Sequence, residues 1–260
     1  MSDDVVISEV RSAVLVVTIN AFALRNSMGA PGVREGLLAA QQRFENDAAL
    51  RVFVLTGAGG VFSAGGNLQQ LREIRDLEAV RQRLQRGGPL LQNILTSDKL
   101  YVAAVEGPAF GAGLGLAAAC DLLVAAEGAR FCAAQIRVGA APDGSLMWSL
   151  PFRVGVGRAR RILLSGEEVS LEDGLAMGLV DVRADKGKAL EAAVRHAERL
   201  AEGPPLAQAM IKRQFAALAD SLDERLAIER EYAARTFVSE DFVEGASAFL
   251  EKRKAEFKGC

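Results

Sequence analysis

Two glycine-rich segments follow apolar strands in this sequence, and each leads into a helix. The first, residues 62–67 (Phe-Ser-Ala-Gly-Gly-Asn), comes after the apolar run 52–55. The second, residues 107–113 (Gly-Pro-Ala-Phe-Gly-Ala-Gly), comes after the run 101–105. Glycine lets the backbone approach a ligand closely, and the first turn of a helix carries N–H groups without intrahelical acceptors. Two such N–H groups directed at one point would stabilise an oxygen that becomes negative during a reaction. The two segments therefore predict an enzyme with an oxyanion-binding site.

The composition indicates a large apolar core and no general affinity for polyanions. Half of the 260 residues are hydrophobic, and 31 basic residues nearly balance 33 acidic ones, which leaves a net charge of -2. This balance argues against a surface for nucleic acid or membrane. The sequence opens on acidic residues rather than on a charged and then apolar leader, and no apolar run is long enough to cross a bilayer. We therefore expect a cytoplasmic protein.

Residues that commonly hold metals or act as general bases are few. The three cysteines, Cys120, Cys132 and Cys260, form no Cys-x-x-Cys pair, and the single histidine, His196, lies in a charged helical stretch. Zinc, a disulfide framework and a Ser-His-Asp triad are therefore not expected. A glycine cluster at residues 57–60 lacks the lysine or the spaced acidic residue of a nucleotide-binding motif.

The pattern of apolar segments predicts a β/α first part and a last part in which helices dominate. Predicted strands cover residues 5–7, 13–19, 52–55, 101–105, 121–125 and 129–132, and predicted helices cover 31–44, 68–84, 113–119 and a stretch that ends near residue 95. We expect a core over residues 1–200 and a helical region over 201–260. The last helices carry apolar residues at helical spacing, so they need a partner surface on the core or on a neighbouring subunit.

Four segments of the sequence resemble the crotonase superfamily, that is, the enoyl-CoA hydratases and isomerases. Residues 62–68 resemble the family's F-x-A-G-x-D-L element, with Asn67 in place of Asp. Residues 104–113 resemble its A-V-x-G-x-A-x-G-G-G element, which is followed by the usual Cys-Asp pair. Residues 20–26 weakly match its N-x-P-x-x-x-N turn, and residues 244–253 match its C-terminal helix. The resemblance covers nearly the whole chain, in order.

This resemblance implies a fold, an assembly and a substrate. The fold is an α/β spiral of ββα units with a helical C-terminal region that mediates trimerisation, often as a dimer of trimers. The substrate is an acyl-CoA thioester, so coenzyme A is part of the substrate and no separate cofactor or metal is expected. By position, the backbone N–H groups of Ala64 and Ala112 would stabilise the oxygen of a thioester enolate.

The resemblance also implies residues that surround the substrate. Arg25 and Lys252 would lie near the CoA phosphates, although both could simply be solvated charges. Phe249 would lie near CoA, although packing is the alternative. The other candidate contacts lie in or beside the matched motifs: Asn67, Leu68, Gly111 and Gln135.

Both glutamates that activate water in hydratases of this family are absent. The matching positions hold Gly115 and Gln135. Glycine carries no proton, and a neutral amide is no practical base, so we do not expect a hydration mechanism that uses two carboxylates. A hydratase with an unidentified base and an acyl-CoA-binding protein without chemistry remain as alternatives.

One carboxyl remains in the expected region. Residues 141–145 (Ala-Pro-Asp-Gly-Ser) resemble the P-D-x-G element of the family's isomerase branches, which include ring-opening isomerases of aromatic-acid degradation. We expect Asp143 to take a proton from C2 of an enoyl-CoA and to return one at C4. Leu146, Met147 and Trp148 would provide its apolar environment. Pro-Asp-Gly is also a turn sequence, so Asp143 could instead cap the following helix.

Overall fold

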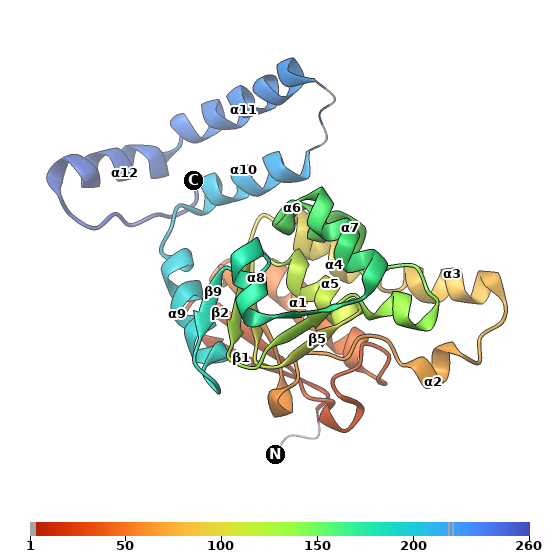
Figure 1. Ribbon diagram of the computed structural model, residues 1–260. Coiled ribbons are helices and arrows are strands. Elements are labelled where there is room, and N and C mark those ends of the chain that lie inside the picture. Colours follow the sequence, from red (N-terminus) through yellow and green to blue (C-terminus); the bar gives the residue numbers. More distant parts are fainter. Residues whose placement is uncertain (1–3, 218, 220) are drawn as a thin grey trace.

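A six-stranded sheet organises the structure (Figure 1). The computed structural model describes residues 4–217, 219 and 221–260, and residues 1–3 at the acidic start of the chain lie outside this part. Strand β1 pairs antiparallel with β2, and every later neighbour in the sheet is parallel. The strands, in spatial order, are β1 (Val6–Arg11), β2 (Val14–Ile19), β3 (Val52–Gly57), β4 (Leu100–Val105), β6 (Leu122–Ala126) and β9 (Val182–Ala184).

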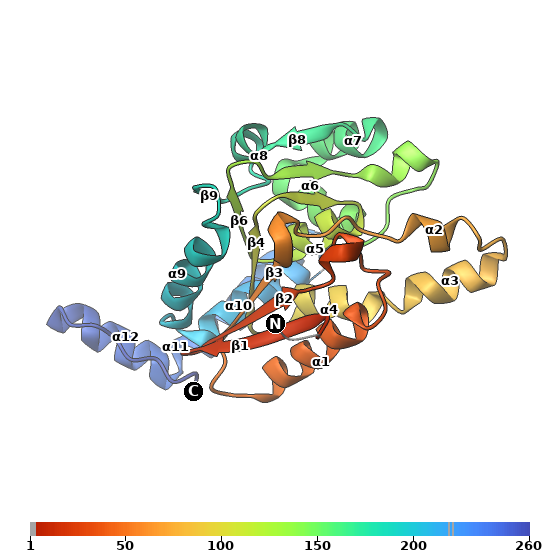
Figure 2. The same cartoon turned by 90° about the horizontal axis from the view of Figure 1, so that it is seen from below.

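Both faces of this sheet are covered, which explains why its strands are almost continuously apolar. In β2, Leu15 and Val17 join the core on one face, whereas Val14 and Val16 join the core on the other face. Figure 2 shows α9 on one side of the sheet and α1 and α4 on the other. The helices that carry these two cores are α9 (Ala189–Ala201) on one face and α1 (Val33–Asn46), α4 (Gly88–Thr96), α5 (Ala112–Ala119) and α6 (Leu146–Val154) on the other.

After the long strands the chain crosses into a second, smaller sheet. This sheet contains β5 (Pro108–Phe110), β7 (Arg130–Cys132) and β8 (Glu168–Ser170), in the order β5-β7-β8. Ser63, which follows β3, extends the arrangement through an isolated parallel bridge to Ala109. The sequence of long strand, short strand and helix therefore recurs along the chain. This recurrence confirms the predicted α/β spiral of ββα units.

Several short elements differ from the sequence prediction. The helix expected over 68–84 is broken into α2 (Leu68–Leu71) and α3 (Leu77–Gln85), because Asp76 starts a new helix by accepting the Ala79 N–H at 2.8 Å. The sequence pattern predicts no strand at β5, β8 or β9, because these three-residue strands lie in glycine-rich or charged segments without an apolar period. The remaining short elements are η1 (Phe22–Leu24), η2 (Ala58–Gly60), η3 (Ala134–Val138), α7 (Val156–Ser165) and α8 (Leu171–Met177).

The C-terminal helices divide into one that packs on the core and two that project from it. Helix α10 (Pro205–Ala216) places the buried Lys212 against Asp121, with 2.8 Å between Nζ and Oδ2. Helices α11 (Leu222–Phe237) and α12 (Glu240–Glu251) extend beyond α10 (Figure 1). Large apolar side chains on and between these two helices are exposed: Leu222, Phe237, Val238, Phe242, Val243, Phe249 and Leu250. Within one chain, the apolar face predicted for this tail is therefore uncovered.

No helix in the described ranges is both long enough and apolar enough to span a membrane.

We predict that the core between the sheet and α1 contributes strongly to stability. Leu37 on α1 is 1% exposed, so Leu37→Ala should lower the free energy of unfolding by about 2–5 kcal/mol. Leu164 on α7 is 70% exposed, so Leu164→Ala is a matched control with an expected change within about 0.5 kcal/mol. Urea unfolding of both variants measures the difference, and equal losses would contradict the assignment of this core.

Candidate active site

The two glycine-rich segments lie backbone against backbone. Gly65 has φ +83°, and a Cβ at this position would stand 2.6 Å from the carbonyl oxygen of Phe110 and 3.1 Å from the nitrogen of Ala112. A Cβ on Gly113 would overlap the carbonyl of Ser63. Only glycine permits these approaches. The pairing that the sequence predicted for the two segments is therefore a direct contact.

Ala112 presents its N–H at the start of α5. Gly111, which precedes it, has φ +55° and donates its own N–H to Cys132 O at 2.8 Å. The first N–H groups of a helix lack intrahelical acceptors, and in the described part of the chain no acceptor is recorded for Ala112 N–H. This N–H is one of the two predicted oxyanion donors.

Ala64, the second predicted donor, already has an acceptor within the protein. Its N–H donates to the carbonyl oxygen of Arg25 at 3.0 Å. To bind an oxyanion, this N–H must be shared with Arg25 or released from it. No motif in the sequence indicates this bond, which joins two segments far apart in the chain.

A buried asparagine fixes the loop that supplies this carbonyl. Arg25 and Asn26 both have left-handed backbones, with φ 51° and 53°. The Asn26 Nδ2 donates to the carbonyls of Ala58 and Val61 at 2.9 and 2.6 Å, and Ser63 Oγ donates to Asn26 O at 2.7 Å. The loop around Arg25 and the first glycine segment are therefore one hydrogen-bonded unit. Asn26 lies in the weakly matched turn at residues 20–26, and asparagine tolerates a positive φ.

Asp143 lies on a turn that packs against the start of α5. Its Oδ1 accepts a hydrogen bond from Gln135 Nε2 at 2.7 Å. The next residue, Gly144, has φ +67°, and a Cβ there would stand 3.2 Å from Ala112 Cα. The carboxyl does not cap α6, whose N-cap is Ser145 without a side-chain cap bond. The helix-cap alternative for Asp143 is therefore wrong, and the carboxyl bonds to an amide side chain instead.

The apolar environment expected for Asp143 is only partly present. Leu146 is buried, but Met147 and Trp148 are 66% and 39% exposed. Successive helical residues point in different directions, so Leu146 faces the core while its two neighbours face outward. The expectation that Met147 and Trp148 would form an apolar environment for this carboxyl is wrong.

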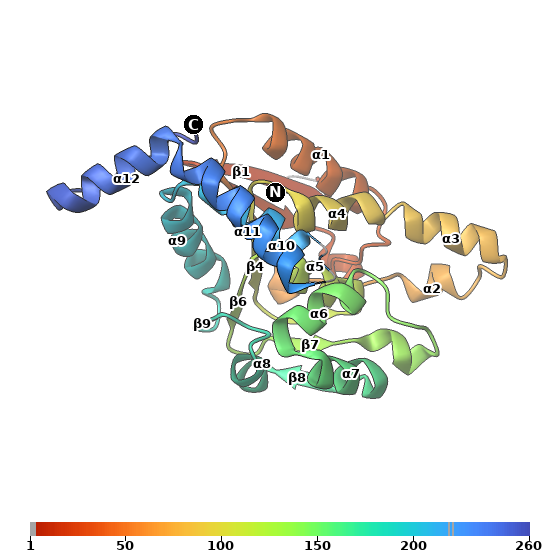
Figure 3. The ribbon, with the colours of Figure 1, turned by 90° about the horizontal axis from the view of Figure 1, so that it is seen from above.

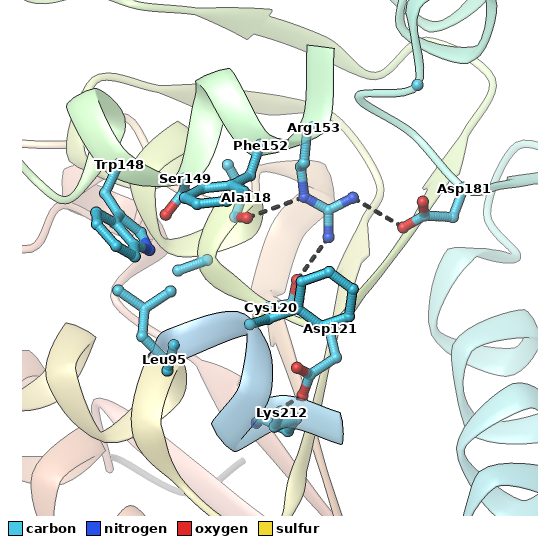
Figure 4. Close-up of a pocket in the computed structure, with 14 residues that line it drawn as sticks. Leu95, Ala118, Cys120, Asp121, Trp148, Ser149, Phe152, Arg153, Asp181 and Lys212 are labelled. Carbon is cyan, nitrogen blue, oxygen red and sulfur yellow. Dashed lines mark hydrogen bonds and ion pairs between the residues drawn. The ribbon is translucent and has the colours of Figure 1, made fainter. Parts of the chain in front are cut away.

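Trp148 instead lines a separate cavity, whose charges are paired within the protein (Figure 4). In this cavity Arg153 pairs with Asp181 at 2.9 Å, and Lys212 pairs with Asp121 at 2.8 Å. Burial raises the pKa of the adjacent Cys120 thiol to about 12, so this thiol stays protonated and is a poor nucleophile. These contacts hold α6 and α10 to the sheet.

The position of the first absent glutamate, Gly115, has no room for a side chain, and the position of the second holds the amide of Gln135. A Cβ on Gly115 would overlap the carbonyl oxygen of Gly144. A glutamate at this position would therefore displace the turn that carries Asp143. Gln135 lies on η3, and its amide touches the space beside Gly111, with Cδ 3.7 Å from where a Cβ would be.

The remaining predicted residues fall into two groups. Near the glycine segments, Asn67 caps α2 by accepting Gln70 N–H at 3.2 Å, while Leu68 and the Arg25 side chain are exposed. Phe249 belongs to the last turn of α12 and Lys252 is its C-cap, and α12 lies on the opposite side of the molecule from α2 and α3 (Figure 1 and Figure 3). One chain therefore does not bring these two residues to the site.

Within the described residues, no group of three or more histidine, cysteine, aspartate or glutamate side chains is arranged to hold an ion.

The two-sheet spiral and the backbone turns at its centre define the class of the protein, which is the crotonase-type α/β fold. A model of the enoyl-CoA hydratase/isomerase family matches residues 9–260. The chain belongs to this family, whose members act on acyl-CoA thioesters.

Individual relatives carry names from both halves of the family. A Rhodobacter capsulatus protein named "Probable enoyl-CoA hydratase" is 36% identical over 258 residues, which cover 96% of each chain. The Escherichia coli 1,2-epoxyphenylacetyl-CoA isomerase is 32% identical over 260 residues, which cover 98% of each chain. The crystal structure of an enoyl-CoA hydratase from a Polaromonas species has a TM-score of 0.91 at 36% identity, and the match covers 97% of this chain and 99% of that one.

We predict that position 115 admits no side chain. Gly115→Ala should lower the free energy of unfolding by about 1–3 kcal/mol, because the added Cβ meets backbone rather than a flexible side chain. Gly157→Ala on α7 is a matched helical control with open space around its Cβ, and it should be neutral or slightly stabilising. Thermal unfolding compares the two, and a neutral Gly115→Ala would disprove the close approach to Gly144.

Proposed function

We propose that this protein is an enoyl-CoA isomerase in which Asp143 is the single acid and base. The observation that carries the proposal is the position of this carboxyl, on a turn packed against Ala112 at the start of α5. The turn itself fills the place where a hydratase of this family would carry its first glutamate. One carboxyl is sufficient to move a double bond from C3–C4 to C2–C3.

The chemistry begins with the acyl thioester oxygen at Ala112 N–H. Asp143 removes a proton from C2, and the electron pair passes onto the thioester oxygen as an enolate. Ala112 N–H and Ala64 N–H, the latter drawn from the Arg25 carbonyl, stabilise this charge. The carboxyl then returns a proton to C4, and the double bond ends at C2–C3.

CoA would contact the loop around Arg25, whose carbonyl accepts the Ala64 N–H. The exposed Arg25 lies in this loop, and its cationic side chain suits a phosphate of CoA. Asn67, Leu68, Gly111 and Gln135 are the proposed neighbours of the acyl and pantetheine portions. Phe249 and Lys252 would reach CoA only across a subunit boundary.

The substitution Asp143→Asn tests the proposal. It should lower turnover of a 3-enoyl-CoA by about 100- to 10,000-fold, since the amide cannot accept the C2 proton. Calorimetry should give an unchanged affinity for the acyl-CoA. Asp185→Asn, at an exposed turn, is the control and should keep full activity. Unchanged turnover by Asp143→Asn would remove this carboxyl from the mechanism.

The names of the relatives favour one competing function, enoyl-CoA hydration. The same preparation separates it from the proposal. Rapid addition of water to crotonyl-CoA would identify a hydratase with another base. Binding of acyl-CoA without exchange of the C2 proton would identify a binding protein without chemistry.

We also propose that α11 and α12 mediate assembly into a trimer or a dimer of trimers. Their exposed apolar side chains support this, because monomers rarely leave so large an apolar surface uncovered. Sedimentation should give three or six times the chain mass of 27.6 kDa. Leu250→Glu should shift the protein toward smaller species, while Leu164→Glu on α7 should not. A monomer at micromolar concentration would refute the assembly.

A further inference from the structure

The two oxygens of the Asp143 carboxyl have different environments. Oδ1 accepts the Nε2–H of Gln135 at 2.7 Å, a distance typical of a strong bond to a charged acceptor. Oδ2 has no hydrogen-bond partner within the described part of the chain, and it is not buried. Oδ2 is therefore the oxygen open to a ligand.

The side chain of Gln135 is held in place by the residues around it. Its Cδ, Nε2 and Oε1 all lie 3.7–3.8 Å from the position of a Cβ on Gly111. Its Oε1 is buried without a hydrogen-bond partner. The segment that carries it is anchored in turn, because Arg137 Nε donates to Gly166 O at 2.6 Å. The amide is thus fixed by packing and by one polar bond, which goes to Asp143.

We propose that Gln135 is a positioning residue that occupies Oδ1 and makes Oδ2 the single oxygen that carries the proton. The proposal rests on the isomerase function proposed above. It gives a specific task to a side chain that stands where hydratases of this family have a glutamate.

The proton transfer balances with this one oxygen. A lone pair on Oδ2 takes the C2 proton, and the C–H electrons pass into the dienolate and onto the thioester oxygen. The dienolate electrons at C4 then take the proton back from Oδ2–H, and the charge returns to the carboxylate. Oδ1 keeps the Gln135 bond throughout, because it remains an acceptor in both protonation states.

A fixed carboxyl keeps the transferred proton on one face of the substrate. The terminal torsion of an aspartate is broad and rotates easily unless a partner holds it. Without the Gln135 donor the carboxyl can turn, exchange its proton with water, and present either oxygen. The proposed role therefore predicts a change in how much of the C2 proton reaches C4, and not only a change in turnover.

The experiment follows deuterium from C2 to C4. A 3-enoyl-CoA that carries two deuterons at C2 is converted in ordinary water, and mass spectrometry and NMR measure deuterium at C4 of the product. The wild type should transfer most of the label. Gln135→Met, of similar length but without a donor, should transfer several-fold less. Gln208→Met, which removes a comparable amide bond to the Leu200 carbonyl on α10, should behave as the wild type.

Gln135→Met should fold, because it also removes a buried amide oxygen that has no partner. Gln135→Leu, which is apolar and has no donor, is the second variant and should likewise lose label transfer. Wild-type transfer in both variants would overturn the positioning role, even if Asp143→Asn is inactive and the isomerase proposal stands. Full turnover by Asp143→Asn would overturn both proposals. Loss of label in the wild type would overturn the single-oxygen path alone.

Discussion

Backbone-to-backbone contact between three turns is the constraint on which the site depends. Gly65 lies against Phe110 and Ala112, Gly113 against Ser63, and Gly115 against Gly144. Each contact exists because a Cβ is missing. Together they place the first glycine segment, the start of α5 and the Asp143 turn at one point. A side chain at any of these glycines would separate the elements, so the geometry of the site depends on the absence of a Cβ at each of them.

This constraint also explains how one member of the family differs from its hydratase relatives. The Gly144 carbonyl fills the space in which a carboxylate on α5 would begin. The second carboxylate is replaced by an amide that bonds to Asp143. The two differences are therefore linked. The turn that leaves no room for a side chain at Gly115 also carries Asp143. Asp143 in turn bonds to Gln135, which stands where the second glutamate would be. The substitution Gly115→Glu alone would displace the turn that carries Asp143.

Much of the fold could be predicted from the sequence, whereas the contacts within the site could not. The apolar runs and the glycine segments gave the long strands and the turns, since their periods and order are strong signals. The break at Asp76 was missed because the apolar pattern runs on across it. The Gln135–Asp143 and Ala64–Arg25 bonds join residues 8 and 39 positions apart, and such pairings depend on tertiary structure. The outward direction of Met147 and Trp148 depends on where α6 begins, which spacing alone does not fix.

The bond between the Ala64 N–H and the Arg25 carbonyl affects which ligands the unliganded site would select. A site with two open N–H groups would attract any small anion or water. In the proposed site, the Ala64 N–H is already bonded to the Arg25 carbonyl, and a ligand that takes this N–H displaces a bond worth about 0.5–1.5 kcal/mol. Chloride or a small carboxylate makes no further contacts that offset this cost, whereas a long thioester makes many. In the proposed mechanism, the loop around Arg25 would therefore favour ligands that carry a large group attached to the oxygen.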